Sequence, residues 1–382
     1  MALKKFNIES DSQRFVMDTI ARKSVKGIPA ALVHIMEIEL LERIAGVSPG
    51  AYIKNPEQTY LKCLYNVGVN FVDQYIPRNP LSMKREGYDS DTVKGSTTGA
   101  ENIVCDGMII DSPEAVAEHL EKIELPRLKQ SIKDFNKDKT AESIIDQEIK
   151  IQSELGPSIL KTGYDFIGFP CFRYFQYGYV NYFTAYALYP ELIEKDFILQ
   201  ADYWELYNSA AARAIVECGL PLMYRLDHDM ADSRGTLVDI KSLEKIWFPH
   251  FERSIKPVMN TGMNLLWHCD GNLMGMVPLL IDCGVKGFQG FQYEDGMDYK
   301  KICRMKAKDG DSLLINAGVS VTTTLPKGTP EDVKNEMKWL VDNGPETGLF
   351  LSASSSIAPG TSHKNVLTFI EGIEYYKKNG RH

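Results

Sequence analysis

The sequence predicts an α/β fold, a single (β/α)8 TIM barrel, and three observations support this class. Eight short apolar runs are spaced along the 382 residues. Segments with helical periodicity or helix-start signals lie between most of these runs. Polar clusters follow directly after several runs, where a buried strand would end. Alternating strands and helices indicate a parallel sheet, and eight such units predict a closed barrel with its functional groups at the carboxyl ends of the strands.

The expected elements follow one another in regular order. The apolar runs that predict strands are 29–35, 70–76, 164–169, 220–226, 263–267, 285–291, 312–315 and 349–351. The clearest predicted helices are 9–27, 190–218, 247–259 and 365–378. Two further helix starts are marked by Ser112 before Pro113 and by Thr329 before Pro330, because Ser and Thr cap helices and Pro is favoured at the first helical position.

The segment at about 77–160 departs from the alternation. Residues 90–110 alternate in polarity and contain glycines, and residues 126–153 are charged and rich in lysine. We therefore expect a hairpin and helical excursion between the second and third strands, inside one domain that spans 1–382. No GxGxxG motif follows a predicted strand and no GxxxxGK[ST] motif occurs, so neither phosphate-binding loop is predicted.

Composition narrows the class of function. The chain is 44% hydrophobic and 25% charged, with a net charge of −8, which argues against a nucleic-acid or anionic-membrane surface. No window approaches the roughly 18 apolar residues that span a membrane, and the first 15 residues lack the apolar core of a signal peptide. Seven cysteines are scattered without a CxxC pair. These features predict a cytoplasmic protein with reduced thiols.

Residues 263–298 carry the strongest functional signal. One apolar run stops at the sequence His-Cys-Asp-Gly, which begins at His268, and the next stops at 292–296, which includes Glu294. In a parallel sheet both polar clusters would lie at the carboxyl ends of neighbouring strands. His268 then serves as a metal ligand or a general acid or base, or it is a loop histidine bonded to backbone. Asp270 is either functional or an Asx-turn acceptor, and Glu294 is either functional or a solvated carboxylate.

A second polar cluster, 227–229, follows the fourth predicted strand. Asp227 and Asp229 would point the same way and His228 the other, because side chains alternate along a strand. The paired carboxylates would bind a metal or protonate a leaving group. The alternative is a loop salt bridge with Arg225 or Arg234.

Three other features have functional and structural interpretations that the residues leave open. The aromatic stretch 172–179 would line an apolar pocket or simply pack in the core. The serines in 352–356 would donate hydrogen bonds to a ligand or form a flexible loop. Cys269 would point away from His268, so we assign it to packing. The GxSxG match at 46–50 does not directly follow a predicted strand, so no nucleophile elbow is predicted and nucleophilic hydrolysis has no support.

The motifs in 200–370 resemble the uroporphyrinogen decarboxylase superfamily. They are the His-Cys-Asp-Gly sequence at 268–271, Gly-Val-Lys-Gly-Phe at 284–288, Glu-Asp-Gly-Met-Asp at 294–298, Thr-Leu-Pro-Lys-Gly-Thr-Pro-Glu at 324–331 and Ile-Ala-Pro-Gly-Thr at 357–361. The resemblance implies one of two chemistries: decarboxylation of a tetrapyrrole, or methyl transfer to or from a corrinoid on a partner protein. The decarboxylase pattern has an N-terminal arginine pair, whereas residues 23–29 read KSVKGIP. A substrate with several carboxylates needs several cations, so this difference favours the corrinoid-dependent methyltransferase branch.

The resemblance also raises the question of zinc. Thiol-methylating members of that branch bind zinc through a His-x-Cys pair and a later Cys. Here Asp270 stands two residues after His268, and serines occupy the later position at 354–356. The resemblance therefore implies a zinc site with nitrogen and oxygen ligands, namely His268, Asp270 and Glu294, with Asp227 or Asp229 nearby. Such a site suits a methyl ether or methylamine donor better than a thiol.

The sequence thus predicts a methyltransferase that cleaves a small methyl donor and passes the methyl group to the Co(I) corrinoid of a partner protein. His268, Asp270 and Glu294 would polarise the leaving atom, and Asp227 or Asp229 would supply a proton. One alternative is a tetrapyrrole decarboxylase, and another is a non-catalytic corrinoid-binding protein on the same scaffold. Neither nucleic acid nor a membrane is an expected partner, and a homodimer stays open.

Overall fold

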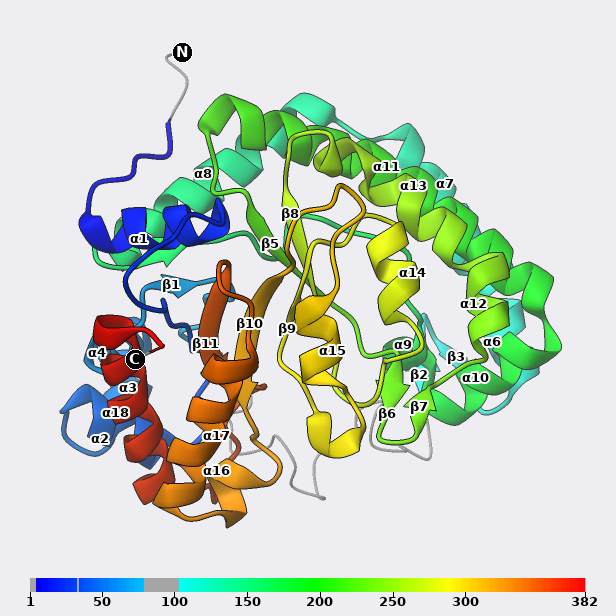
Figure 1. Ribbon diagram of the computed structural model, residues 1–382. Helices are drawn as coiled ribbons and strands as arrows, with labels where there is room; N and C mark the ends of the chain where they lie inside the picture. The colour runs from blue at the N-terminus through cyan, green and yellow to red at the C-terminus, as the bar shows by residue number, and fades with distance from the viewer. Residues whose placement is uncertain (1–4, 33, 79–102, 382) are drawn as a thin grey trace.

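A five-stranded parallel sheet forms the centre of the computed structural model, which describes residues 5–32, 34–78 and 103–381. Its strand order is β11-β10-β9-β8-β5 (Figure 1). The strands are β5 (Met223–Asp227), β8 (Asn264–His268), β9 (Gly287–Gln289), β10 (Leu314–Val319) and β11 (Leu349–Ala353). Almost every residue of these strands is buried, as expected for a parallel sheet covered on both faces.

A second, two-stranded parallel sheet pairs β1 (Phe71–Val72) with β4 (Leu160–Lys161). An isolated parallel bridge between Gly163 and Tyr224 connects this pair to β5. On its other side, Asn70 N donates to Ala30 O at 2.8 Å.

The expected closed barrel sheet is not confirmed. At the far edge of the large sheet, Ala30 forms an isolated parallel bridge with Leu351 of β11. In the described residues of the first predicted strand, 29–35, Ala30 and Ile35 form isolated bridges, the latter with Ile357, and no extended ladder. Within the described residues the structure therefore has two separate parallel sheets joined by single bridges, and no continuous closed ladder.

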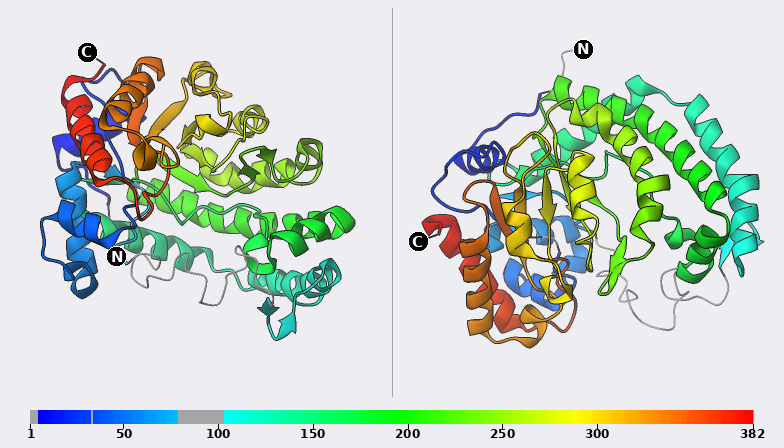
Figure 2. Two further views of the ribbon diagram at one scale, coloured as in Figure 1. Left: turned by 90° about the horizontal axis from the view of Figure 1, so that it is seen from below. Right: turned by 45° about the vertical axis from the view of Figure 1, so that its right-hand side comes forward.

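Helices surround the sheet, as Figures 1 and 2 show from three directions. Those of the N-terminal half are α1 (Asp11–Ile20), α2 (Ile38–Ala45), α3 (Ala51–Lys54), α4 (Pro56–Val67), α6 (Pro113–His119), η2 (Leu120–Glu124), α7 (Leu125–Lys133), α8 (Lys137–Leu155), α9 (Tyr174–Tyr177) and α10 (Tyr179–Leu188). Those that follow are α11 (Pro190–Cys218), α12 (Ile240–Ile246), α13 (Phe248–Met259), α14 (Val277–Asp282), η3 (Tyr293–Asp295), α15 (Tyr299–Arg304), α16 (Thr324–Lys327), α17 (Pro330–Asn343) and α18 (His363–Asn379).

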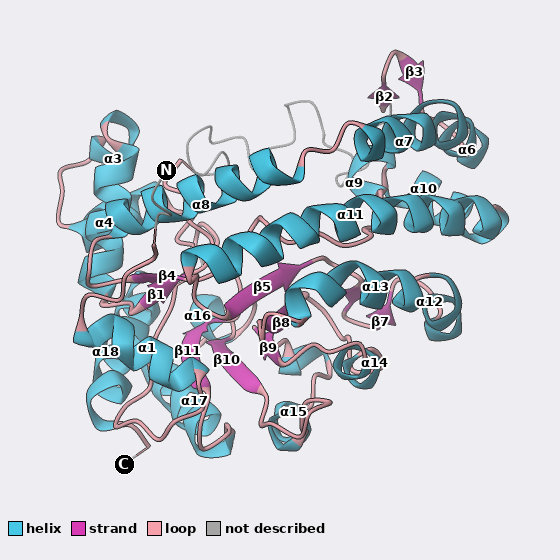
Figure 3. Ribbon diagram, turned by 90° about the horizontal axis from the view of Figure 1, so that it is seen from above, coloured by secondary structure: helices cyan, strands magenta, loops and turns pink. Residues whose placement is uncertain are grey.

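The excursion between β1 and β4 contains a hairpin and helices. The hairpin pairs β2 (Val104–Cys105) with β3 (Met108–Ile109), and α6, η2, α7 and α8 follow it. Figure 3 shows α8 alongside α11 on one side of the sheet. The part of the expected excursion at 79–102 lies outside the described residues. A second hairpin, β6 (Ala231–Asp232) with β7 (Gly235–Thr236), follows β5.

Local signals explain how the helices begin. The Ser112 hydroxyl accepts from the backbone N–H of Ala115 at the start of α6. Thr329 and Asp332 form a reciprocal capping box at the start of α17, with the Asp332 carboxylate accepting from the Thr329 N–H at 2.8 Å. Both starts match the sequence prediction, because each cap satisfies N–H groups that the first helical turn leaves without partners.

The alternation of side chains along β8 shows which face of the sheet is covered by the outer helices and which faces the interior. Trp267 packs against Phe251 of α13, with ring centroids 5.5 Å apart, so Trp267 faces the outer helices. The next residue, His268, must then face the interior enclosed by the strands. No helix among the described residues is both long and apolar enough to cross a membrane.

Candidate active site

A row of four polar side chains crosses the interior near the carboxyl ends of the strands. Register pairs Asp227 of β5 with His268 of β8, His268 with Gln289 of β9, and Gln289 with Asn316 of β10. Residues paired in register on neighbouring strands point to the same face. Since His268 faces the interior, we infer that Asp227, Gln289 and Asn316 face it too. We refer to these four residues as the polar row.

His268 is held in one tautomer by its neighbour. Its side chain is buried, and Nδ1 lies 3.3 Å from the carbonyl oxygen of Gln289. A carbonyl only accepts hydrogen bonds, so in this contact Nδ1 carries the proton and the lone pair of the neutral ring is on Nε2. Nε2 lies 3.9 Å from Asp270 Oδ1. The ring therefore presents a proton acceptor toward the loop after β8.

Gly290 makes room for the His268 ring. Its φ is +67°, and a Cβ there would lie 2.4 Å from Ser354 O and 3.2 Å from His268 Nδ1. An L-residue would therefore be strained and would collide with the backbone. The glycine in the run that forms β9 thus fixes how closely the loops after β9 and β11 approach the histidine.

Two carboxylates sit beside the histidine in the loops after β5 and β8. Asp229 Oδ1 accepts from the backbone N–H of Asp270 at 3.2 Å. The Asp270 carboxylate in turn accepts from Gln292 Nε2 and from the Ser355 hydroxyl, each at 3.4 Å. Burial raises the pKa of Asp229, and the nearby charge of Asp270 raises it further. A raised pKa favours the protonated form of Asp229.

Arg225 fixes the other predicted carboxylate. Its guanidinium donates to Asp73 Oδ2 at 2.6 Å, to Asp227 Oδ2 at 2.9 Å and to Gln74 Oε1 at 3.2 Å. Burial lowers the pKa of Arg225, but the charges of Asp73 and Asp227 outweigh it and leave the pKa above its ordinary value. Burial would raise the pKa of Asp73, yet the charge of Arg225 brings it below its ordinary value. The salt bridge between Asp227 and Arg225 is the structural alternative that the sequence left open.

A chain of hydrogen bonds extends from Asp227 to the first predicted strand. The Tyr164 hydroxyl donates to Asp227 Oδ2 at 3.2 Å and accepts from Gln74 Nε2 at 2.9 Å. The Gln74 carbonyl oxygen lies 2.8 Å from His34 Nε2, and burial lowers the pKa of that histidine. Sequence reasoning did not assign Tyr164 or Gln74 to the site, because both lie in apolar runs, 164–169 and 70–76, that contain no motif.

Glu294 lies in a different hydrogen-bond group. It is exposed on η3, where its Oε1 accepts from the hydroxyls of Ser320, at 2.6 Å, and Thr322. Glu336 of α17 joins the same group, since its Oε1 accepts from the Ser320 N–H at 2.7 Å. Glu294 therefore organises the loop after β10, and the structure does not bring it together with His268 and Asp270.

The arrangement does not fit the zinc site that the resemblance implies. Zinc needs at least three protein ligands at metal–ligand distances of about 2 Å. The atoms of His268, Asp270 and Glu294 do not form a group within 4.8 Å of one another, and neither do those of His268, Asp270 and Asp229. His268 and Asp270 alone offer two ligand atoms, 3.9 Å apart. In the observed arrangement these residues therefore do not provide the three ligands of a zinc ion.

His228 has a structural role on the opposite face of β5. Its Nε2 accepts from the backbone N–H of Phe172 at 2.9 Å, and burial lowers its pKa to about 4. Its ring stacks on Tyr174 at 5.7 Å, and Tyr174 stacks on Tyr179 at 4.5 Å. The Tyr174 hydroxyl donates to Asp229 O at 3.0 Å. The stretch 172–179 thus packs against the end of β5, and its stack of rings borders Asp229.

Another group of titratable residues lies in the excursion. Asp106, His119 and Glu124 place their ligand atoms within 4.8 Å of one another. Arg127 contacts both carboxylates and Arg173 contacts Glu124 at 3.0 Å, so cations already neutralise the group. It anchors the β2–β3 hairpin and is not a candidate active site.

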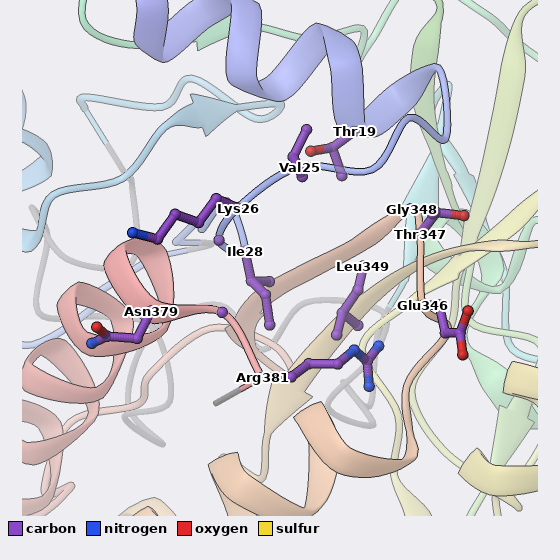
Figure 4. Close-up of a pocket in the computed structure, with 12 residues that line it drawn as sticks. Thr19, Val25, Lys26, Ile28, Glu346, Thr347, Gly348, Leu349, Asn379 and Arg381 are labelled. Atoms are coloured by element: carbon purple, nitrogen blue, oxygen red, sulfur yellow. The ribbon is translucent and has the colours of Figure 1, made fainter.

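The cavity in Figure 4 lies away from the polar row. Its volume is about 210 Å³, and its lining includes Lys26, Gly348 and Arg381. Gly348 directly precedes β11, so the cavity opens at the amino end of that strand. Catalytic groups in parallel α/β folds lie at the carboxyl ends of the strands. This cavity therefore lies at the opposite, amino-terminal end of the strands.

The fold is similar to that of a solved methyltransferase structure. A methyltransferase from Methanosarcina mazei matches with a TM-score of 0.56 over 96% of this chain and 99% of that chain, at 17% sequence identity. The chain has the fold of that methyltransferase. This agrees with the superfamily resemblance of the motifs, and at this identity it shows the fold alone. A Listeria monocytogenes protein described as a vitamin-B12-independent methionine synthase has a TM-score of only 0.35, at 15% identity over 61% of this chain and 68% of that chain, which is too low to indicate a shared fold. No family model and no curated protein sequence matches the chain.

Proposed function

We propose that the protein is a methyltransferase that takes a methyl group from a small donor of the methyl ether or methylamine type. The methyl group passes to the Co(I) corrinoid of a partner protein. The observation that carries the proposal is the polar row beside Asp229 and Asp270, at the carboxyl ends of strands in a fold shared with a methyltransferase. This is the place where catalytic groups of parallel α/β enzymes lie.

The site residues have different roles in methyl transfer. The methyl acceptor attacks carbon from one side while the bond to the leaving atom breaks on the other. The leaving atom departs readily only if it ends neutral, so it must receive a proton or already carry one. Asp229, with its raised pKa, is the carboxyl suited to hold that proton, while His268 Nε2 accepts a hydrogen bond from a methyl donor that carries an N–H or O–H group, such as a methylamine. Asp227 is paired with Arg225 and therefore positions its neighbours.

The charge of the site argues against tetrapyrrole decarboxylase activity. A substrate with several carboxylates needs several cations that are free to pair with it. In the described residues, Arg225 is the guanidinium beside the polar row, and Asp73 and Asp227 already neutralise it. A non-catalytic corrinoid-binding protein would have no use for the carboxylates at 229 and 270.

A methyl-transfer assay tests the proposal. Purified protein is mixed with a reduced corrinoid, free or on a corrinoid protein, and with methyl ethers and methylamines in turn, and loss of the Co(I) absorbance is followed. We expect at least one donor to methylate the corrinoid and His268→Ala to lower the rate by about 100-fold or more. His363→Ala is the matched control, because His363 pairs with Glu37 at the start of α18.

Two further outcomes bear on the alternatives. Turnover that persists in the presence of chelators would agree with the observed ligand geometry. Decarboxylation of a porphyrinogen, with no methyl transfer from any donor, would overturn the proposal. Corrinoid binding without turnover, unaffected by His268→Ala, would also overturn it.

A further inference from the structure

The loops around the polar row hold more negative charge than the protein itself neutralises. Asp73 and Asp227 share one guanidinium, that of Arg225. Asp229 and Asp270 contact each other's loops, and in the described part of the chain no Lys or Arg lies within ion-pair distance of either. Their nearest basic group is His268, whose Nε2 is 3.9 Å from Asp270 Oδ1. A bound cation would relieve this excess, and a bound neutral molecule would not.

Two buried carbonyl oxygens in the polar row have no hydrogen-bond partner among the described residues. They are Gln289 Oε1 and Asn316 Oδ1, on residues only 3% and 4% exposed. The Gln289 amide is oriented by its Nε2, which donates to Ser354 O at 3.5 Å. A buried acceptor without a partner costs about 1–3 kcal/mol, so such groups are normally satisfied by a ligand or water. Carbonyl oxygens accept, and they therefore call for a ligand with N–H or O–H donors.

We propose that the methyl donor binds as a protonated methylamine, with its N–H groups directed at the amide oxygens of Gln289 and Asn316. The carboxylates of Asp229 and Asp270 balance its positive charge. This inference rests on the proposed function and names the substrate class of the same site.

A methyl donor in its ammonium form also provides a leaving group that departs without negative charge. In the transfer step the C–N bond breaks and its electron pair stays on nitrogen, which leaves as a neutral amine. The electron pair of the Co(I) corrinoid forms the new bond to carbon, and cobalt is formally oxidised to Co(III). No proton has to be delivered during the step, because the nitrogen already carries it. Carboxylates that favour the ammonium form therefore keep the donor in the state that can react.

A divalent metal ion is the other cation that carboxylates attract. It would use the lone pair of His268 and the oxygens of Asp229 and Asp270, but these atoms are not gathered within 4.8 Å. A metal would also leave the Gln289 and Asn316 oxygens to be satisfied separately. The observations thus favour an organic ammonium ion, and the metal is treated as an outcome of the experiment.

Binding of matched small molecules to the whole protein tests the inference without turnover. Dimethylammonium and dimethyl ether have the same shape and differ in charge and in N–H groups, and tetramethylammonium has charge without N–H. Affinities are measured by calorimetry, or by the chemical shift of the ligand methyl signal. We expect dimethylammonium to bind at least tenfold more tightly than dimethyl ether, and more tightly than tetramethylammonium.

Variants then locate the site. Asp229→Asn keeps the shape of the side chain, and we expect it to weaken dimethylammonium binding about tenfold while leaving dimethyl ether unaffected. Gln289→Leu is expected to remove the preference for dimethylammonium over tetramethylammonium. Asp342→Asn, which changes an exposed carboxylate paired with Lys338 on α17, is the control and should have no effect. If either site variant fails to fold, the comparison of the three ligands on the unchanged protein still decides the matter.

The outcomes separate this inference from the proposed function. Equal affinity for the ammonium ion and the ether would overturn the inference, and so would methyl transfer from ethers alone, although that result would leave the proposed function standing. Tight zinc binding that Asp229→Asn abolishes, without ammonium binding, would overturn it in favour of a metal. Ammonium binding that depends on Asp229, with no methyl transfer to any Co(I) corrinoid, would uphold the inference and refute the proposed function.

Discussion

Glu336 should make the stability of the protein fall between pH 5 and pH 8. Its Oε1 accepts from the Ser320 N–H at 2.7 Å, and its Oε2 is buried with no partner in the described structure. Burial raises its pKa from 4.5 to about 7. Because the folded pKa is the higher one, the folded state keeps a proton that the unfolded chain loses. The stability this provides is complete below pH 4.5 and is lost as pH rises through about 7.

The magnitude follows from the two pKa values. The difference between them corresponds to about 3 kcal/mol over the full titration. By pH 5 the unfolded carboxyl is already largely ionised, and the side chain is partly solvated, so about 2 kcal/mol is left between pH 5 and pH 8. Urea unfolding at the two pH values measures this loss as a difference in the free energy of unfolding.

The test compares the unchanged protein with Glu336→Gln. The amide keeps an acceptor for the Ser320 N–H and cannot ionise, and any constant cost of burying it cancels between the two pH values. We expect the unchanged protein to lose about 2 kcal/mol more than the variant when the pH is raised from 5 to 8. Glu331→Gln, on the exposed first turn of the same helix, serves as the control and should match the unchanged protein. Equal losses in Glu336→Gln and the unchanged protein would show that this carboxyl is not buried as described.

Three further predictions concern the frame of the site. Gly290→Ala should lower the free energy of unfolding by at least about 2 kcal/mol more than Gly310→Ala, as measured by urea unfolding. Both glycines have positive φ, but only Gly290 has backbone and side-chain atoms in the way of a Cβ, so equal effects would contradict the proposed packing. Arg225→Met should destabilise by about 3–5 kcal/mol, because it leaves the partly buried carboxylates of Asp73 and Asp227 unpaired, against less than about 1 kcal/mol for the half-exposed Arg213→Met. His228 should stay neutral from pH 8 down to about pH 4 in a histidine NMR titration, and a midpoint near 6.5 would show that its ring is not the buried acceptor described.

The apolar runs predicted the central sheet well because its strands are buried on both faces. Runs at 220–226, 263–267, 285–291, 312–315 and 349–351 overlap β5, β8, β9, β10 and β11. Such strands read as continuous apolar stretches, which is the pattern that sequence detects most directly. The positions of His268 and Asp227 at strand ends followed from the same pattern, since a polar residue marks where the buried run stops.

The predicted third strand begins later in the sequence than the observed strand, because the observed strand contains the lysine of a buried ion pair. The prediction began at 164, whereas β4 is Leu160–Lys161 and the bridge to β5 is at Gly163. Lys161 is only 2% exposed and its Nζ pairs with Glu148 of α8 at 3.2 Å. From the sequence alone, a lysine is expected to be solvated. Its partner Glu148 lies in a helix whose charged sequence is typical of a surface segment. Only the three-dimensional pairing reveals the strand.

The buried amides of the strands are not predicted from sequence for a related reason. Gln289 lies in an apolar run and Asn316 directly follows one, and neither belongs to a motif, whereas Arg225 is predicted only as a possible salt-bridge partner. A buried polar residue inside a strand is itself a signal, because its burial is costly unless another group satisfies it. Arg225 is satisfied by two carboxylates, whereas the side-chain oxygens of Gln289 and Asn316 are not satisfied by any described residue. Glu294, by contrast, was chosen for its place at a strand end, and its role in catalysis stays a prediction.

The site must provide a leaving group that departs without negative charge, and the structure bears on the three ways to achieve this. A metal would have to gather His268, Asp270 and a third ligand, and their atoms are too far apart in the observed arrangement. A proton from Asp229 is consistent with its raised pKa, but then the unpaired charge of Asp270 beside it would oppose the ionised product. A donor that arrives with its own proton and positive charge neutralises both carboxylates at once and satisfies the amide oxygens of the polar row. The third way uses every polar group that the other two leave unexplained, which is why the ammonium ion is the donor to test first.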